Sequence, residues 1–230
     1  LCALGAIFQI IGTYTLLNCF KKRSFAVGIA FSKLEAPLAA IIGLILFADP
    51  LELLGIIGIL ISVCGVYFLS NFTQNLTLNS VIKQLQHNQT INGIICGFSF
   101  ALCSVCFRHA NLTLEQGSTL QNGINTLFIV VLIQTTILTI WLSKKHVNQL
   151  IKSKHNLYHC LGIGLFGISA SVCWFSAFGL ANAAYVKTVG QIEVPISILL
   201  SYLLFKETLN KKEYIGIGLI IAAILLFIRL

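Results

Sequence analysis

Eight long apolar stretches dominate this sequence and decide which folds are open to it. Each runs for about 20 residues, the length that an α-helix needs to cross the hydrocarbon core of a bilayer. No alternating pattern typical of a membrane β-barrel is visible, and lipid offers the backbone no hydrogen bonds, so helices are expected. We predict an all-α, polytopic membrane protein. The expected spans are residues 1–20, 25–48, 51–70, 92–110, 123–142, 158–180, 183–205 and 212–230.

The composition agrees with lipid as the main solvent. Hydrophobic residues make up 57% of the chain and charged residues 10%, whereas soluble domains carry about 25% charged residues. The net charge of +8 comes from short loops between apolar runs, and no aromatic platform accompanies it, so we expect no nucleic-acid partner. The expected partners are membrane lipid and a small-molecule substrate, and a homodimer is left open.

The two ends of the chain contain an internal repeat with an offset of 158 residues. Glu35 and Pro37 in one apolar stretch fall on Glu193 and Pro195 in another without a gap. A Glu-x-Pro sequence inside a span is rare, and its recurrence in one register indicates a duplicated structural unit.

The repeat predicts the domain organisation. We expect residues 1–70 to be the last three helices of a first repeat, residues 71–91 to be a polar linker, and residues 92–230 to be a complete second repeat of five helices. Two helices are then expected before Leu1, which gives ten in all. An odd number of helices per repeat places the two copies in opposite orientations.

Loop charge predicts the orientation in the membrane. One set of alternate loops holds almost all basic residues, and the other has only Arg108 and Arg229 at its edges. The positive-inside rule then places the linker 71–91 in the cytoplasm and Leu230 on the outer side. The residues on the basic side are Lys21, Lys22, Arg23, Lys83, Lys144, Lys145, Lys152, Lys154, Lys206, Lys211 and Lys212.

Four segments resemble the EamA-type permeases of the drug/metabolite transporter superfamily. They are Leu34–Asp49, Gly58–Gly65, Trp174–Leu180 and Ala184–Glu193, the last being similar to a branch found in Gram-negative bacteria. The resemblance implies ten helices in two inverted five-helix repeats, a transport role and the inner membrane of a Gram-negative bacterium. It also implies that both termini are cytoplasmic, contrary to the loop charge, and here we follow the charge.

Charged residues inside spans are the first candidates for a functional site. A charge at the centre of a span costs about 2.5–3.5 kcal/mol on insertion scales, so such residues usually face the interior or a water-filled cavity. The repeat makes Glu35 and Glu193 equivalent, and the inverted fold should bring them near a pseudo-two-fold axis. Either carboxyl could bind a proton or substrate, or both could be structural partners of Lys33 and Lys187.

Further candidates surround these charges. Pro37 and Pro195 each remove a backbone donor and disturb the preceding turn, which serves either as a hinge or as a packing kink. Gln191 shares a helical face with Lys187. Other candidates for a cavity wall, each with an ordinary packing or interfacial role as the alternative, are Tyr14, Arg108, Gln134 and Trp174.

The sequence favours a secondary transporter that moves a small organic solute by alternating access around a midplane cavity. No G-x-x-x-x-G-K motif is present to bind ATP, and no cofactor or metal is expected. An intramembrane enzyme is one alternative, but Ser169 has no histidine deep in an opposite span. A scaffold subunit is another, although it would gain little from charges in lipid.

Overall fold

The computed structural model describes residues 1–20, 32–69, 88–114, 117–145, 157–205 and 211–227. Within these ranges the chain is almost entirely helical and contains no strand. The expected all-α fold is therefore confirmed. The described helices are α1 (Cys2–Phe20), α3 (Glu35–Phe47), α4 (Leu53–Leu69), α6 (Asn88–Leu112), α7 (Thr119–Lys145), α9 (Leu157–Leu180), α10 (Ala183–Gly190), α11 (Glu193–Phe205) and α12 (Lys211–Phe227).

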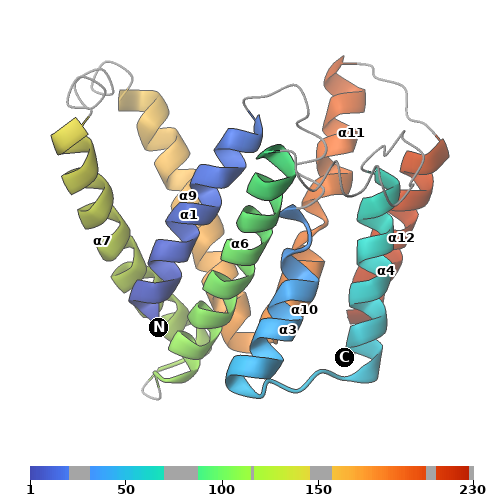
Figure 1. Ribbon diagram of the computed structural model, residues 1–230, viewed down its shortest axis with the longest axis horizontal. Helices are drawn as coiled ribbons and strands as arrows, with labels where there is room; N and C mark the ends of the chain where they lie inside the picture. The colour runs from blue at the N-terminus through green and yellow to red at the C-terminus, as the bar shows by residue number, and fades with distance from the viewer. Residues whose placement is uncertain (21–31, 70–87, 115–116, 146–156, 206–210, 228–230) are drawn as a thin grey trace.

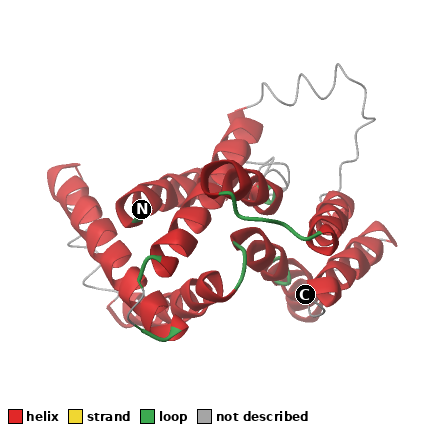
Figure 2. Ribbon diagram, turned by 90° about the horizontal axis from the view of Figure 1, so that it is seen from below, coloured by secondary structure: helices red, strands yellow, loops and turns green. Residues whose placement is uncertain are grey.

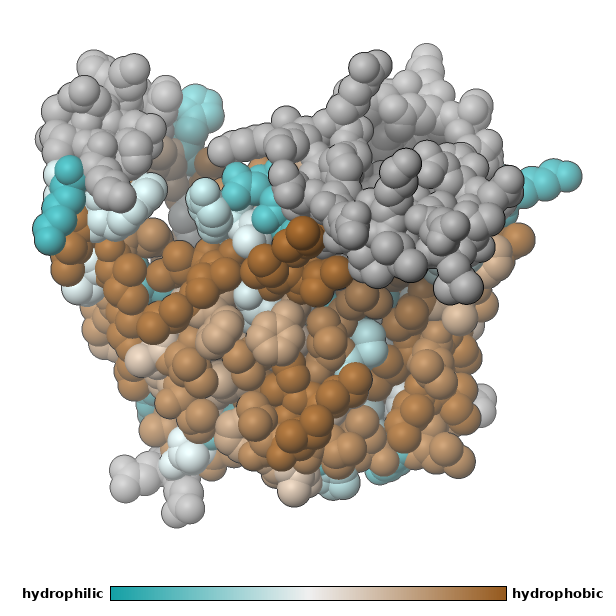
Figure 3. Space-filling view, viewed as in Figure 1, coloured by the Kyte–Doolittle hydropathy of each residue, from teal (hydrophilic) through white to brown (hydrophobic). Residues whose placement is uncertain are grey.

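Length and hydropathy support a polytopic membrane protein. Five described helical stretches are long and apolar enough to cross a bilayer, and three shorter apolar helices accompany them. Large apolar side chains face outward, among them Phe166 at 78% and Ile163 at 74% exposure. On the face drawn in Figure 3, hydrophobic residues form a continuous brown belt, and hydrophilic residues coloured teal lie above it. A soluble monomer rarely exposes so much contiguous apolar surface, so this belt fits contact with lipid.

The helices stand roughly side by side, with segments from both ends of the chain interleaved (Figure 1). Helix α1 packs against α6, and α3 lies between α6 and α10, while α7 pairs with α9. Seen from below in Figure 2, α4 and α12 form a separate pair at one end of the molecule. The turns after α3 and α9 both lie at the edge drawn lowest in Figure 1, which we call the lower edge.

The buried core forms where α1, α3, α6, α9 and α10 meet. The rings of Phe107 and Phe175 are 1% and 2% exposed, and their centroids lie 4.6 Å apart. Small residues such as Ala36, Ala39 and Ala101 are fully buried around them. Small side chains at these positions let the helix backbones approach closely, as packing between helices in lipid requires.

Within the described residues, the expected spans 25–48 and 183–205 each contain a turn close to the proline that was expected to disturb the helix. A turn at Lys33–Leu34 precedes α3, and a turn at Gln191–Ile192 separates α10 from α11. Proline supplies the physical reason, because its ring clashes with the carbonyl four residues earlier and it has no N–H to donate there. Those carbonyls belong to Lys33 for Pro37 and to Gln191 for Pro195. The two breaks are therefore equivalent in the repeat, and each lies immediately before a glutamate.

Helices α4 and α12 pack through glycines. A Cβ on Gly65 would lie 3.0 Å from the carbonyl oxygen of Gly216, and a Cβ on Gly216 would lie 2.8 Å from the carbonyl oxygen of Gly65. The two backbones thus touch with no side chain between them, as in other small-residue contacts between membrane helices. This contact joins a helix before the linker to the last helix of the chain.

Candidate functional site

Two ion pairs connect the helix breaks, and they are crossed between the two ends of the chain. Lys33 beside the first break pairs with Glu193, which begins α11 after the second break. Lys187 in α10 donates from Nζ to Oε2 of Glu35, the first residue of α3, at 3.2 Å. Each glutamate is thus neutralised by a lysine from the other end of the sequence. This arrangement reduces the cost of four charges within apolar helices, because buried charges need a close partner.

The Lys187 ammonium is also surrounded by aromatic rings. Its Nζ lies 4.9 Å from the ring centroid of Trp174, 5.4 Å from that of Phe100 and 6.0 Å from that of Phe178. Ring faces attract a cation, most strongly where water is excluded. The Lys187 side chain is 12% exposed. Aromatic rings and the Glu35 carboxylate therefore replace most of the water that an ammonium group requires.

Glycine at position 190 makes room for one of these rings. A Cβ on Gly190 would overlap the outer edge of the Trp174 indole. Gly190 is the last residue of α10, immediately before the break. The end of α10 can consequently lie directly against Trp174 only because this position has no side chain.

The two ion pairs differ in exposure. Glu35 and Lys187 are 14% and 12% exposed, whereas Glu193 is 58% exposed although its partner Lys33 is 14% exposed. One carboxylate is therefore enclosed and its repeat equivalent is accessible.

Gln191 is a buried polar side chain within the second break. It is 1% exposed, and within the described part of the chain neither its Oε1 nor its Nε2 has a hydrogen-bond partner. An unpaired buried amide costs about 1–3 kcal/mol. The backbone around it is satisfied in part by short-range bonds, with Gln191 N–H donating to Thr188 and Val194 N–H donating to Gln191.

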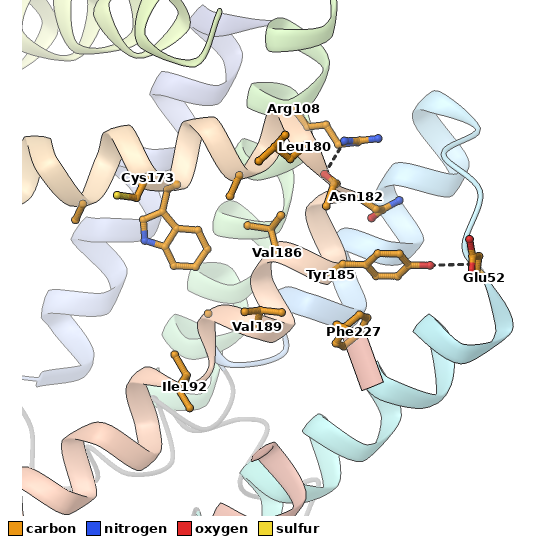
Figure 4. Close-up of a pocket in the computed structure, with 15 residues that line it drawn as sticks. Glu52, Arg108, Cys173, Leu180, Asn182, Tyr185, Val186, Val189, Ile192 and Phe227 are labelled. Atoms are coloured by element: carbon orange, nitrogen blue, oxygen red, sulfur yellow. Dashed lines mark hydrogen bonds between the residues drawn. The ribbon is translucent and has the colours of Figure 1, made fainter. Parts of the chain in front are cut away.

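A cavity of about 830 Å³ lies beside the second break. Its walls are mainly apolar, and its polar groups are contributed by Glu52, Arg108, Asn182 and Tyr185. Figure 4 shows Cys173, Val189 and Ile192 on one side of the cavity and Tyr185, Asn182 and Glu52 towards the other. A largely apolar cavity with a few polar groups grouped at one end is typical of a site for a small organic molecule.

Two hydrogen-bonded bridges fix the polar end. Arg108 donates from Nε to Asp49 Oδ2 at 3.0 Å and from Nη1 to the carbonyl oxygens of Phe178 and Ala181 at 3.2 and 2.5 Å. The backbone N–H of Glu52 donates to the Tyr185 hydroxyl at 2.8 Å.

Local structure explains how these groups are positioned. Helix α3 ends with Ala48 in the left-handed region at φ 49°, and Asp49 N–H donates to Gly43 at 3.2 Å. This closing turn holds Asp49 beside Arg108. At the opposite side, Asn182 caps α10 by accepting from Ala184 N–H at 2.9 Å, which places Tyr185 in the first turn of that helix.

The structure brings only some of the expected residues to this region. Trp174 lines the cavity, and Lys33, Glu35, Lys187, Gln191 and Glu193 lie around the two breaks. Pro37 and Pro195 are each the third residue of the helix that follows a break. The pattern did not single out Glu52, Asn182 or Tyr185. The one available signal was Asn182, which directly precedes the apolar run that begins at residue 183, because asparagine is a common helix cap.

Two expected wall residues lie elsewhere. Tyr14 is 63% exposed on α1 and is not among the residues that line the cavity. Gln134 of α7 donates to the side-chain oxygen of Gln9 at 2.7 Å and so joins α7 to α1. Both residues are polar or amphipathic within apolar helices, a feature that marks helix contacts and lipid interfaces as readily as a cavity. Ser169, the serine considered for an intramembrane enzyme, donates its hydroxyl to the carbonyl oxygen of Leu165 within its own helix.

Several of the basic loop residues lie outside the described residues, namely Lys21–Arg23, Lys83, Lys152, Lys154 and Lys206, as do residues 71–87 of the expected linker. The described helix α7 ends at Lys145 and α12 begins at Lys211, both at the edge drawn uppermost in Figure 1. The described charges at the opposite edge include Asp49, Glu52 and Arg108.

Comparisons with known proteins identify the family. The model of the EamA-like transporter family matches residues 90–229. The chain therefore belongs to the EamA-like transporter family and is a multi-pass membrane protein of a group that transports small solutes. No match is found among curated proteins. One solved crystal structure is similar over 98% of this chain and 75% of its own, with a TM-score of 0.66 and 14% identity, and it supports the fold alone.

Proposed function

We propose that the chain is a secondary transporter that moves a small organic solute by alternating access around the cavity beside the helix breaks. The cavity is the solute site, and the crossed ion pairs are the charges that change environment during the cycle. The two breaks then act as hinges at equivalent positions of two inverted repeats. Within this proposal, residues 1–70 and 92–230 belong to different repeats joined by the expected linker 71–91, although residues 88–91 already form the first turn of α6.

The observation that carries the proposal is the pairing of each glutamate with a lysine across the repeats. Glu35 is enclosed by Lys187, while Glu193 is 58% exposed beside Lys33. In an inverted pair of repeats, movement of one against the other exchanges which side of the molecule is open. Such a movement would also exchange the environments of the two carboxylates, so proton uptake and release at these groups can be coupled to solute movement.

The test is uptake into proteoliposomes that contain the purified full chain. A panel of radiolabelled amino acids, sugars, carboxylic acids and organic cations is supplied with and without a pH gradient. We expect one chemical group of solutes to accumulate above protein-free liposomes. Glu193→Gln should remove the dependence on the pH gradient, and the matched carboxyl change Glu213→Gln, at the start of α12 outside the cavity, should leave it intact.

Three outcomes bear on the proposal separately. Failure of folded wild-type protein to take up any solute of the panel contradicts transport of these compounds. Uptake that is insensitive to both the pH gradient and Glu193→Gln contradicts proton coupling through Glu193 but leaves solute movement standing. Uptake that Glu213→Gln reduces as much as Glu193→Gln contradicts a specific role for the helix break.

A further inference from the structure

The short segment 48–52 is held by the two bridges at the lower edge of the molecule. Asp49 accepts from Arg108 Nε at 3.0 Å, and the Glu52 N–H donates to the Tyr185 hydroxyl at 2.8 Å. The segment connects α3 to α4 and precedes the linker. Arg108 and Tyr185 belong to α6 and α10, which follow the linker. The two bridges therefore tie together parts of the chain that the proposed transport cycle moves against each other.

Arg108 makes this connection unusually firm. Besides Asp49 it binds the carbonyl oxygens of Phe178 and Ala181, which lie at the end of α9 and in the turn that follows. One guanidinium thus joins α6, segment 48–52 and the α9–α10 turn. The side chains of Arg108 and Asp49 are 15% and 12% exposed. A largely buried, charge-assisted contact of this kind is stronger than an ion pair on the surface.

The same two side chains that hold segment 48–52 also form the cavity wall. Arg108 and Tyr185 both line the cavity, as does Glu52 itself. Figure 4 shows the Tyr185 hydroxyl directed from the cavity towards Glu52. A molecule at the polar end of the cavity would compete with the bonds that hold the segment if it accepted from Arg108 Nε or donated to the Tyr185 hydroxyl.

We propose that segment 48–52 is a latch that Arg108 and Tyr185 hold shut at the lower edge, and that a solute in the cavity releases. This inference rests on the proposed function, because transport of a solute is what requires the lower edge to open. The contacts that must break are the two bridges, Arg108 to Asp49 and Glu52 to Tyr185, and the 3.3 Å contact between His109 Nε2 and Asp49 Oδ2. Opening then exposes the cavity wall to water at that edge.

A natural cysteine provides the measurement. Cys173 is exposed and lines the cavity, whereas Cys19, Cys96, Cys103 and Cys106 are buried. Replacing the three other accessible cysteines, Cys2, Cys64 and Cys160, with alanine leaves Cys173 as the reactive thiol. Because Cys173 is already exposed in this structure, its rate of reaction with a membrane-impermeant maleimide sets a baseline, and a rise above that baseline reports greater access of water to the cavity; adding Cys173→Ala gives the blank.

The labelling is performed on vesicles of both orientations. Thr113→Cys, at an exposed position near the turn after α6 on the lower edge, identifies the orientation that presents this edge to the reagent. Asp49→Asn weakens the first bridge, and Tyr185→Phe removes the second with a change of one hydroxyl. Tyr158→Phe is the matched control, because Tyr158 is 90% exposed at the start of α9.

We expect Asp49→Asn and Tyr185→Phe each to raise the Cys173 labelling rate about fivefold from the lower edge, as the loss of one hydrogen bond would do. Tyr158→Phe should not change the rate. An unchanged rate in both bridge variants overturns the latch, and so does an equal rise from both orientations, which indicates general loosening. If size-exclusion chromatography shows that Asp49→Asn does not fold, the Tyr185→Phe result alone decides whether the latch stands.

Failure of the latch and failure of the proposed transport are distinguishable. Labelling follows the position of a segment and requires no solute movement. If the protein takes up solute but the bridge variants do not change the labelling rate, the latch is contradicted and transport stands. If the labelling rate changes but no solute is taken up, segment 48–52 moves as proposed and transport of the panel is contradicted.

Discussion

Lys187 donates to Glu35 across 3.2 Å, and this bond joins α10 to the first turn of α3 over a separation of 152 residues. The pair lies between the two helix breaks and behind the Trp174 ring that lines the cavity. It thus connects the cavity wall to both ends of the chain. The predictions below test this pair, the side chains next to it and the helix contact at the end of the molecule.

Glu35→Gln should destabilise the protein more than Glu193→Gln does. Removal of one partner from a buried ion pair leaves an uncompensated charge, which costs about 3 kcal/mol. Glu193 is 58% exposed, so its loss should cost less than about 1 kcal/mol. Chemical denaturation in detergent micelles measures both. The double variant Glu35→Gln with Lys187→Met should recover most of the stability, and equal losses in the two single variants would refute the difference between the pairs.

Gln191→Met should raise stability and lower transport. Both polar atoms of the Gln191 side chain are buried without a partner in the described structure, so an apolar side chain of similar size should gain about 1 kcal/mol. The same amide is a candidate ligand at the break, and its loss should reduce uptake of the solute found in the panel. Denaturation and uptake are measured on one preparation. Higher stability with unchanged uptake would mean that the amide has no part in transport.

Gly190→Ala should displace Trp174. The new Cβ would overlap the indole ring, and overpacking of this kind costs about 1–3 kcal/mol. Tryptophan fluorescence should change, and a Trp141→Phe background makes Trp174 the single emitter, since the sequence has two tryptophans. Gly162→Ala is the control because nothing described lies within 4 Å of its Cβ position. Identical spectra before and after the Gly190 change would show that the ring is not held there.

Gly216→Ala should weaken the contact between α4 and α12. Its Cβ would lie 2.8 Å from the carbonyl oxygen of Gly65, so the helices must separate or shift, at a cost of about 1–3 kcal/mol. The neighbouring Gly218→Ala meets nothing within 4 Å and should be neutral or slightly stabilising. Thermal unfolding of the two variants in the same detergent provides the comparison. A larger loss for Gly218→Ala than for Gly216→Ala would contradict the packing.

The sequence was sufficient for the fold class because hydropathy measures the length of apolar runs, which the bilayer thickness constrains directly. Hydropathy did not show the breaks at Lys33–Leu34 and Gln191–Ile192, because the apolar runs continue through both and hydropathy carries no information on backbone conformation. The signal came from Pro37 and Pro195, which the sequence marked as a hinge or a packing kink. The carbonyl that each proline disturbs belongs to Lys33 or Gln191.

The pairing of charges could not be read from spacing. Lys33 lies two residues from Glu35, and side chains so spaced on a helix do not face each other. The observed partners are separated by 160 and 152 residues, so they depend on how the two ends of the chain pack. Arg108 shows the same limit. The sequence left Arg108 open as a cavity-wall or an interfacial residue, and it lines the cavity. Its three bonds arise from Asp49, Phe178 and Ala181 in other segments.

The contact between Gly65 and Gly216 restricts how the proposed transport cycle can proceed. The side chains of Ile220 and Leu69 lie against Gly65 and Gly216 respectively, so the two helices interlock where their backbones touch. This contact joins α4 to α12, at the opposite end of the molecule from α7. The proposed cycle would therefore have to move the other helices while this pair stays together.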